Sequence, residues 1–206
     1  MRVSRQKAAE SRERIIDAAG ALFREKGFDG IGVADIMKAA QLTHGGFYGH
    51  FASKDDLIVA YLEDRSRTFL HQWDEAFDRY RDNPRAQLRA IMTYIAERTT
   101  KEGYRGCPFI NFCAEFPDAA HPGRRAAQAT KRALHERFLR LTEALQVPQP
   151  KQLADSFLLL VEGAYAISQT LGGGRNGVGH SLVWASEALV EAQTNKARSK
   201  PSKRDR

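Results

Sequence analysis

Residues 43–56, with the sequence THGGFYGHFASKDD, gather groups suited to binding a negatively charged polymer. Thr43 is of a type that caps a helix, and Ser53 with Asp56 has the spacing of a capping box. Phe47 and Phe51, four residues apart, share one helical face. The opposite face has no carboxylate, and its glycines let a backbone approach closely. It consists of His44, Gly45, Gly46, Tyr48 and His50, with Lys54 following at the next helix start. This pattern predicts a DNA-recognition helix.

The segments before this short helix are expected to form a compact helical unit with it. Residues 8–26 have an apolar stripe with helical spacing, and Gly27 supplies the left-handed residue that ends a helix. A second, short helix is expected at residues 33–40, with a tight connection to Thr43. Three helices with short connections, of which the third has an unusual polar face, predict a helix-turn-helix.

The rest of the chain also has the period of helices, and no segment alternates convincingly with period two. We therefore expect an all-α protein with about nine helices. Beyond the first three, they are expected at about residues 54–80, around 88–95, and at 108–116, 121–145, 152–171 and 178–193.

The net charge of +7 lies at the two ends of the 206-residue chain. Residues 1–54 hold 9 Lys or Arg against 6 Asp or Glu, residues 55–195 hold 17 against 18, and residues 196–206 hold 6 against 1. This partition favours one nucleic-acid module attached to an electrically neutral body, with a role in solubility alone as the alternative.

Cysteine content and hydropathy indicate a cytoplasmic protein with no membrane partner. Cys107 and Cys113 are too few for a disulfide framework, and no N-terminal apolar run resembles a signal peptide. The longest uninterrupted apolar stretch, residues 157–161, is far too short to span a membrane.

An enzyme is the main alternative from another functional class. Gly172, Gly174 and Gly177 satisfy the GxGxxG pattern, but they follow a helix and not a strand. The six histidines show no metal-ligand spacing, and no nucleophile elbow is present. The sequence therefore predicts neither catalysis nor a cofactor or metal site.

Residues 10–57 resemble the tetracycline-repressor (TetR) family of bacterial transcription regulators, through GGFYGHFASKDDL and the preceding helix, glycine stop and short helix. The resemblance implies a three-helix DNA-binding domain at residues 1–54, with a basic N-terminal arm. It implies a larger helical domain at 55–195 that dimerises and binds a small molecule. The basic tail at 196–206 is expected to be disordered.

The resemblance also assigns roles within the short helix. The side chains implied to contact phosphates are those of Tyr48, His50 and Lys54, and the positions where the family reads bases are His44, Gly45 and Gly46. One departure is that residues 32–34 read Gly-Val-Ala, where relatives usually have Thr and a polar or basic residue. Some DNA affinity is then expected from the basic arm.

The segments that line the family's ligand pocket supply an aromatic-rich set of residues here, which favours an apolar or aromatic effector. The set comprises Trp73, Phe77, Met92, Cys107, Phe109, Phe112, Phe138 and Tyr165. Their alternative role is simple core packing. GCPFINFCAEF also resembles a Gly-Cys subgroup of the family, so a reactive thiol at Cys107 is a second route to regulation, against an inert cysteine.

Two helices, at 152–171 and 178–193, are apolar on more than one side, which indicates a partner subunit. We expect a homodimer formed by a four-helix bundle, unless both faces are covered within one chain. The residues expected in the interface are Phe157, Leu160, Val161, Ala164, Leu182, Ala185 and Leu189.

Together these features predict a dimeric regulator, most simply a repressor that binds a palindromic operator in double-stranded DNA and is released by a small-molecule effector or a thiol-reactive compound. Effector binding would change the separation of the two recognition helices, which must match half-sites about 34–36 Å apart. A constitutive DNA-binding dimer without an effector is the alternative, and a helical enzyme is a remote one.

Overall fold

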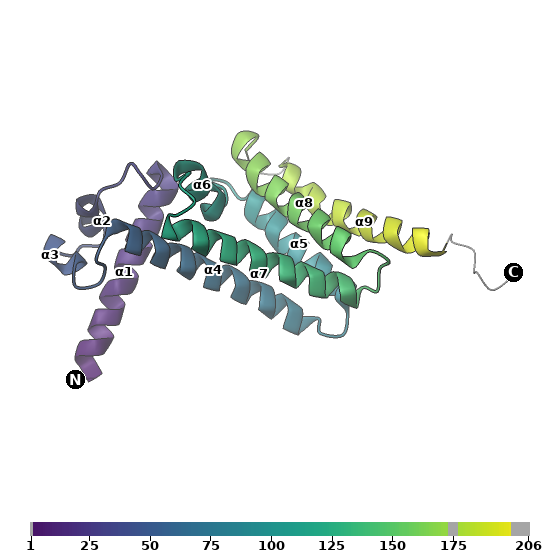
Figure 1. The fold of residues 1–206 in the computed structure, drawn as a ribbon, viewed down its shortest axis with the longest axis horizontal. Coiled ribbons are helices and arrows are strands. Elements are labelled where there is room, and N and C mark those ends of the chain that lie inside the picture. The colour runs from purple at the N-terminus through teal and green to yellow at the C-terminus, as the bar shows by residue number, and fades with distance from the viewer. Residues whose placement is uncertain (1, 173–176, 199–206) are drawn as a thin grey trace, which may run out of the picture. The chain divides into compact units, whose positions relative to one another are not determined.

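The computed structural model describes residues 2–172 and 177–198, and every regular element in those ranges is helical (Figure 1). The elements are α1 (Arg2–Lys26), α2 (Val33–Ala39), α3 (His44–Phe47), α4 (Lys54–Arg79), α5 (Pro84–Thr100), α6 (Pro108–Glu115), α7 (Pro122–Ala144), α8 (Pro150–Thr170), the 3₁₀ helix η1 (Val178–His180) and α9 (Ser181–Arg198). The predicted all-α fold is confirmed. None of these helices is both long and apolar enough to cross a bilayer.

Local sequence signals account for most helix ends. Gly27 ends α1, as predicted, because its φ of +82° turns the chain out of the helix; its N–H still donates to the carbonyl of Phe23 at 3.1 Å. Ser53 accepts the N–H of Asp56 at 3.1 Å and donates its hydroxyl to the Asp56 carboxylate at 2.8 Å, so the expected cap of α4 is present. Thr43 is the N-cap of α3, but its hydroxyl makes no capping bond, so that part of the prediction was wrong.

Two predicted boundaries were also wrong. Helix α1 begins at Arg2 and not near Ala8, because residues 5–10 are good helix formers that continue the helix although all are exposed. Helix α9 runs to Arg198, so the first three residues of the expected disordered tail are helical. The rest of that tail lies outside the described residues.

The described residues divide into two compact units. One comprises the residues up to Phe69 together with Cys107–Thr130, and the other comprises Leu70–Gly106 and the residues from Lys131 onward. Helices α4 and α7 each contribute to both units. The functional division at residue 54 remains a prediction, because packing groups α6 and the start of α7 with the first unit.

The core of the first unit is built from aromatic rings. Phe28 packs on Phe23 with ring centroids 4.7 Å apart and on Phe112 at 5.3 Å, while Tyr61 contacts Phe23 at 5.5 Å. Gly20 permits this packing, since a Cβ there would lie 2.6 Å from Cε2 of Tyr61. These contacts join α1, α4 and α6.

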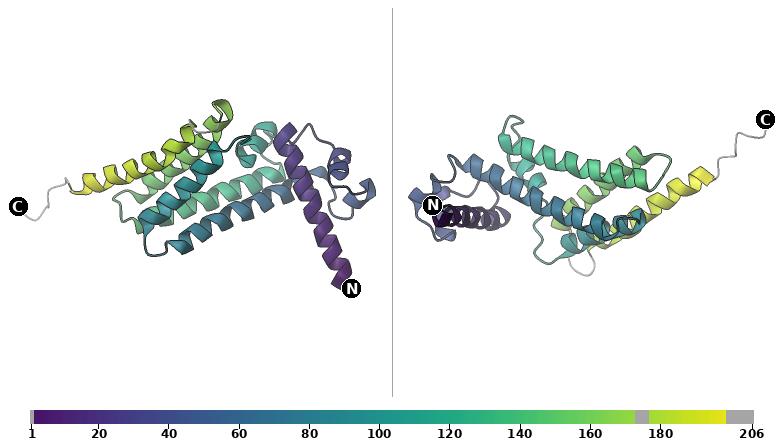
Figure 2. Two further views of the ribbon diagram at one scale, coloured as in Figure 1. Left: turned by 180° about the vertical axis from the view of Figure 1, so that it is seen from behind. Right: turned by 90° about the horizontal axis from the view of Figure 1, so that it is seen from below.

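In the second unit α5 packs against α8 and α9, which also pack on each other (Figure 2). Trp73 of α4 meets Phe138 of α7 edge to face at 4.8 Å, and Phe138 in turn lies 5.6 Å from Phe157 of α8. Arg137 donates two hydrogen bonds of 2.8 Å to Asp74. This hydrogen bonding holds the pKa of the Asp74 carboxyl below its ordinary value. The rings therefore link α4, α7 and α8.

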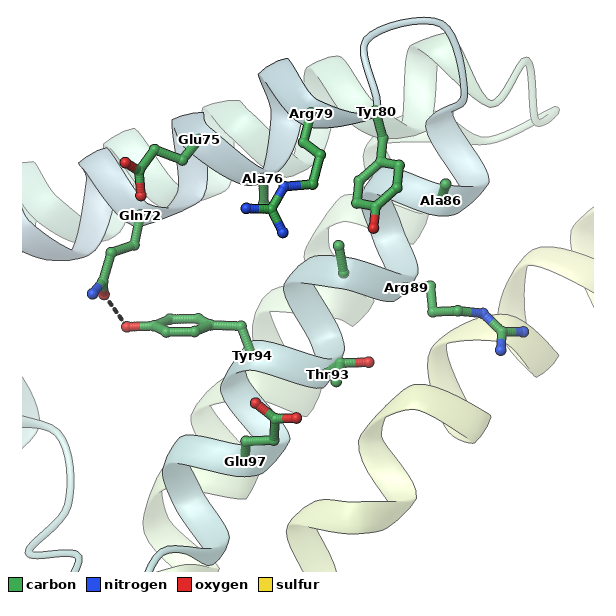
Figure 3. A pocket seen from close by; sticks show the side chains of 11 residues that line it. Gln72, Glu75, Ala76, Arg79, Tyr80, Ala86, Arg89, Thr93, Tyr94 and Glu97 are labelled. Carbon is green, nitrogen blue, oxygen red and sulfur yellow. Dashed lines mark hydrogen bonds between the residues drawn. The ribbon is translucent and has the colours of Figure 1, made fainter.

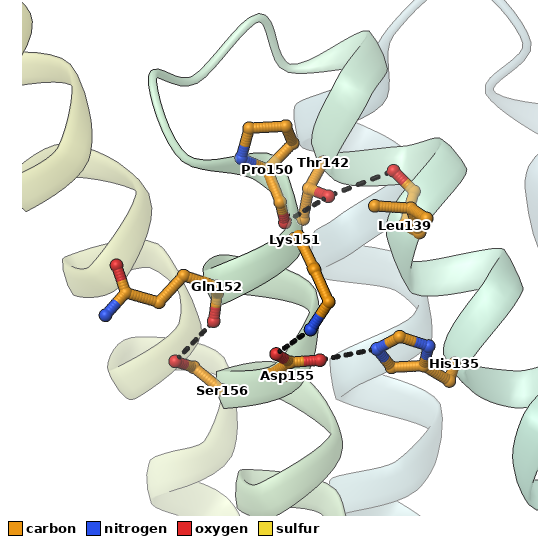
Figure 4. A network of polar contacts seen from close by, with 8 residues as sticks. All are labelled: His135, Leu139, Thr142, Pro150, Lys151, Gln152, Asp155 and Ser156. Atoms are coloured by element: carbon orange, nitrogen blue, oxygen red, sulfur yellow. Dashed lines mark hydrogen bonds and ion pairs between the residues drawn. The ribbon is translucent and has the colours of Figure 1, made fainter.

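A polar network joins α7 to the start of α8 (Figure 4). The Thr142 hydroxyl bridges the Leu139 and Pro150 carbonyls at 3.0 and 2.8 Å. Asp155 accepts from Lys151 at 2.8 Å and lies 2.6 Å from Nε2 of His135. The hydrogen bond from Lys151, followed by that from His135, lowers the pKa of Asp155. The network thus joins the end of α7 to the start of α8.

Candidate nucleic-acid interface and ligand site

Helices α1, α2 and α3 form the expected helix-turn-helix, with α2 packed on both α1 and α3. Arg14 of α1 fastens the turn between α2 and α3, because its guanidinium donates to the carbonyl of Ala40 at 2.6 Å. Gln41 in that turn has φ of +55°, a left-handed conformation that is uncommon for a residue with a side chain. The angle between α2 and α3 is thus set by a tight turn that Arg14 of α1 stabilises.

The two faces of the short helix separate as the sequence predicts. Phe47 and Phe51 are 0% and 4% exposed, and their rings lie 5.7 Å apart in the core. Tyr48, on the other side, is 63% exposed. Gly45 is exposed as well, and a Cβ built there meets nothing within 4 Å. This face of α3 is therefore open for close approach by a second molecule.

The remaining residues predicted to contact DNA differ in accessibility. Thr43 and Gly46 are exposed, while His50 and Lys54 are half-buried. The Lys54 ammonium donates to the carbonyl of Asp29 at 3.1 Å, so it braces the turn before α2 as well as placing a charge at the start of α4. His44 belongs to α3, but its side chain lies outside the described residues.

Glu115 is a positioning residue that sequence patterns did not reveal. Its carboxylate accepts the backbone N–H groups of Phe28 at 2.7 Å and Asp29 at 3.0 Å, directly after the end of α1. Gly27 leaves the space for it, since a Cβ at Gly27 would lie 3.0 Å from the same carboxylate. Helix α6 thereby holds the α1–α2 turn of the helix-turn-helix. No local signal could identify this contact, because its partners are 87 residues apart.

Replacing Glu115 by alanine is expected to lower the free energy of unfolding by about 1–2 kcal/mol, because two backbone donors lose a charged acceptor. Urea denaturation followed by circular dichroism measures this change. The matched control is Glu143→Ala, which removes an exposed carboxylate on α7. Equal effects of the two substitutions would show that Glu115 does not hold the turn.

The predicted ligand-binding residues fall into separate groups. Cys107, Phe109 and Phe112 belong to the first unit, where Phe112 packs on Phe116 and His121 at 4.9 and 5.1 Å. The members in the second unit are Trp73, Phe77, Met92, Phe138 and Tyr165. All but Phe77 are at most 6% exposed, as the alternative of core packing would require. Their role in binding an effector stays a prediction.

A groove that the sequence analysis did not predict lies between α4 and α5 in the second unit (Figure 3). Its volume is about 600 Å³. Arg79 and Arg89 balance Glu75 and Glu97 along its walls, and Tyr94 donates its hydroxyl to Gln72 at one end. The groove is open, and charged side chains contribute to its walls, unlike the aromatic site that was expected.

Both cysteines lie at α6 without a disulfide between them. Cys107 is the N-cap of α6 and only 5% exposed, whereas Cys113 is half-buried. Within the described ranges, there is no cluster of three or more His, Cys, Asp or Glu side chains that could hold a metal ion.

Four of the predicted interface residues belong to the chain's own core. Phe157, Val161, Ala164 and Leu182 are at most 7% exposed, because α5, α7 and α9 cover them. The other three, Leu160, Ala185 and Leu189, are half-buried. The exposed apolar side chains of this region are instead Leu159 and Trp184, each 73% exposed, with Leu171 and Val178. Leu159 and Trp184 are the large apolar side chains of α8 and α9 that remain exposed in a single chain.

Comparison with known proteins identifies the family. Residues 15–61, which contain the C-terminal part of α1, all of α2 and α3 and the start of α4, match the model of bacterial regulatory proteins of the tetR family. The crystal structure of SCO4454, a TetR-family transcriptional regulator from Streptomyces coelicolor, superposes with a TM-score of 0.83 at 28% identity, over 90% of this chain and 97% of that one. The chain belongs to the TetR family.

Relatives with assigned names are also regulators. The transcriptional regulator AcuR of Cereibacter sphaeroides is 28% identical over 76% of this chain and 75% of its own length. The transcriptional repressor NemR of Escherichia coli is 26% identical, but the match covers 57% of this chain and 59% of that protein. This TetR-family protein is accordingly a DNA-binding transcriptional regulator and not an enzyme.

Proposed function

We propose that this protein is a cytoplasmic, homodimeric repressor that binds a palindromic operator and is released by a small-molecule effector. The observation that carries the proposal is the open face of α3, where a Cβ built at Gly45 meets no atom of another element within 4 Å and Tyr48 is 63% exposed beside a buried pair of phenylalanines. A recognition helix positions its N-terminal residues at base edges and its flanking donors at phosphates. The site accordingly consists of Thr43, His44, Gly45, Gly46, Tyr48, His50 and Lys54.

Dimerisation is supported by the exposed apolar side chains of α8 and α9. Leu159 and Trp184 are each 73% exposed, and isolated large side chains of this kind gain free energy when a second copy covers them. A twofold dimer would carry two copies of α3, as a palindrome requires. Release by an effector would then follow from a change in the separation of the two copies.

Regulation through a thiol is the second candidate, and it concerns Cys107. The observation in favour is its position as the N-cap of α6. Its exposure of only 5% requires that α6 move before an electrophile can react. A small-molecule effector is therefore favoured over a thiol reagent.

Gly45→Ala tests the proposed contact surface. The substitution is expected to leave the melting temperature unchanged or slightly raised, because the new methyl group meets nothing and alanine favours a helix over glycine by about 1 kcal/mol. Affinity for the operator is expected to fall about tenfold, which corresponds to about 1.4 kcal/mol, because the methyl group lies where the DNA approaches.

The operator is found by selecting bound fragments of the organism's own genome, and affinities are measured by gel shift at fixed salt. Ala21→Ser is the matched control, since it changes one small exposed residue on α1. A Gly45→Ala protein that binds the selected operator as tightly as the parent would remove α3 from the interface. Selection of no fragment at low ionic strength would refute DNA binding itself.

A further inference from the structure

Arg98, in the last turn of α5, is a half-buried cation without a carboxylate partner. Its guanidinium donates one long hydrogen bond of 3.3 Å to the Tyr94 hydroxyl. No Asp or Glu in the described part of the chain forms an ion pair with it. A guanidinium has five N–H donors, and leaving them unsatisfied away from water is unfavourable. Most of the donor capacity of Arg98 is therefore open to a further acceptor.

Three tyrosines lie near this guanidinium. Burial lowers the pKa of Arg98, but the hydrogen bond to Tyr94 and the nearby Tyr165 and Tyr104 together raise the pKa by more, so the net shift is upward and the group stays charged. The rings of Tyr104 and Tyr165 are stacked with centroids 6.4 Å apart. These residues come from α5, the turn after it and α8, all within the second unit. They provide aromatic surface and hydroxyl groups beside the cation.

Another cation beside Tyr165, that of Lys131, is already neutralised. The Lys131 ammonium lies 5.5 Å from the centroid of the Tyr165 ring and pairs with the Glu162 carboxylate. Arg98 thus supplies one uncompensated positive charge. One such charge matches a monocarboxylate better than a phosphate dianion, and a guanidinium presents parallel donors to the two carboxylate oxygens.

From this cluster we infer that the effector is a monocarboxylate with an apolar or aromatic body, bound by Arg98 together with Tyr94, Tyr104 and Tyr165. The inference deepens the proposed function and rests on it, because it names the chemical class of the ligand that releases the operator. The carboxylate would occupy the open donors of Arg98, and the body would lie against the tyrosine rings.

An ordinary structural role for Arg98 makes the opposite prediction about stability. A cation in the last turn of a helix interacts favourably with the helix dipole, so its removal would destabilise the protein. A half-buried charge that is unpaired until a ligand binds destabilises the ligand-free protein. Replacing Arg98 by an apolar side chain would then leave the melting temperature unchanged or raise it. Arg98→Met separates the two roles before any ligand is added.

The binding test uses the full-length protein and pairs of probes that differ only in charge. Propionate, hexanoate, benzoate and phenylacetate are each titrated by calorimetry beside the corresponding amide, with inorganic phosphate as a further arm. At least one carboxylate is expected to bind at least tenfold more tightly than its amide and than phosphate. Arg98→Met is expected to abolish that preference. The control, Arg89→Met, removes an exposed arginine on the same helix, paired with Glu187 at 2.6 Å, and should retain it.

Three results would overturn the inference. The first is that no carboxylate binds more tightly than its amide, and the second is that such a preference survives Arg98→Met. The third is that Arg98→Met lowers the melting temperature below that of the parent protein. A gel shift with the best carboxylate keeps the proposed function separate. Tight binding of the carboxylate without release of the operator would refute effector control while the binding site stands.

Discussion

Replacing Leu159 and Trp184 by glutamate is expected to convert the protein to a monomer and to weaken operator binding by at least about 100-fold, or about 2.7 kcal/mol. Each side chain is 73% exposed, so neither contributes much to the fold of one chain. A twofold dimer buries two copies of each side chain, one from each protomer. Full burial of a large apolar side chain contributes about 1.5–3 kcal/mol. A monomer also loses the second recognition helix that binds the palindrome.

Light scattering after size-exclusion chromatography measures the mass of the double variant, and a gel shift measures its affinity. Tyr80→Glu is the control, because it places a new carboxylate at another exposed aromatic residue, 38% exposed at the end of α4. Circular dichroism should show unchanged helix content in both proteins. Retention of the dimer by the double variant would place the subunit contact elsewhere.

Replacing Phe112 by alanine is expected to lower the free energy of unfolding by about 3–5 kcal/mol. Phe112 is 0% exposed and lies against Phe28, Phe116 and His121, with ring centroids 4.9–5.3 Å away. Gly123 approaches it so closely that a Cβ there would lie 2.5 Å from Cζ of the ring. Truncation therefore leaves a cavity that the helices around it cannot easily fill.

Urea denaturation of the purified protein measures this loss. Tyr48→Ala is the comparison, because that ring is 63% exposed and its removal should change stability by no more than about 0.5 kcal/mol. A loss below about 1 kcal/mol for Phe112→Ala would mean that the site is not close-packed. That result would support the alternative prediction that Phe112 lines a ligand cavity.

Features determined by neighbouring residues were predictable from the sequence. Gly27 ends α1 because only glycine readily adopts φ of +82°, and Ser53 caps α4 through a partner three residues away. The amphipathic pattern likewise placed Phe47 and Phe51 inside and Tyr48 outside. Each of these depends on backbone geometry within one or two helical turns.

Features that depend on contacts between residues distant in the sequence could not be predicted. Arg14 and Ala40 are 26 residues apart, and Glu115 and Phe28 are 87 apart, so neither contact has a local pattern. Periodicity also showed that α8 is apolar on more than one side, but it did not show what covers each side. Phe157 and Val161 were consequently assigned to a partner, whereas helices of the same chain bury them completely.

The burial of Cys107 makes it an internal reporter of local opening in the protein. Cys113, at the other end of the same helix, is half-buried and meets a thiol reagent first, while Cys107 at 5% exposure becomes modified only when α6 leaves its place. In a Cys113→Ser background, the rate of alkylation would measure how often that helix detaches. Because Glu115 of the same helix holds the α1–α2 turn, this rate also gauges how firmly the recognition module is held together.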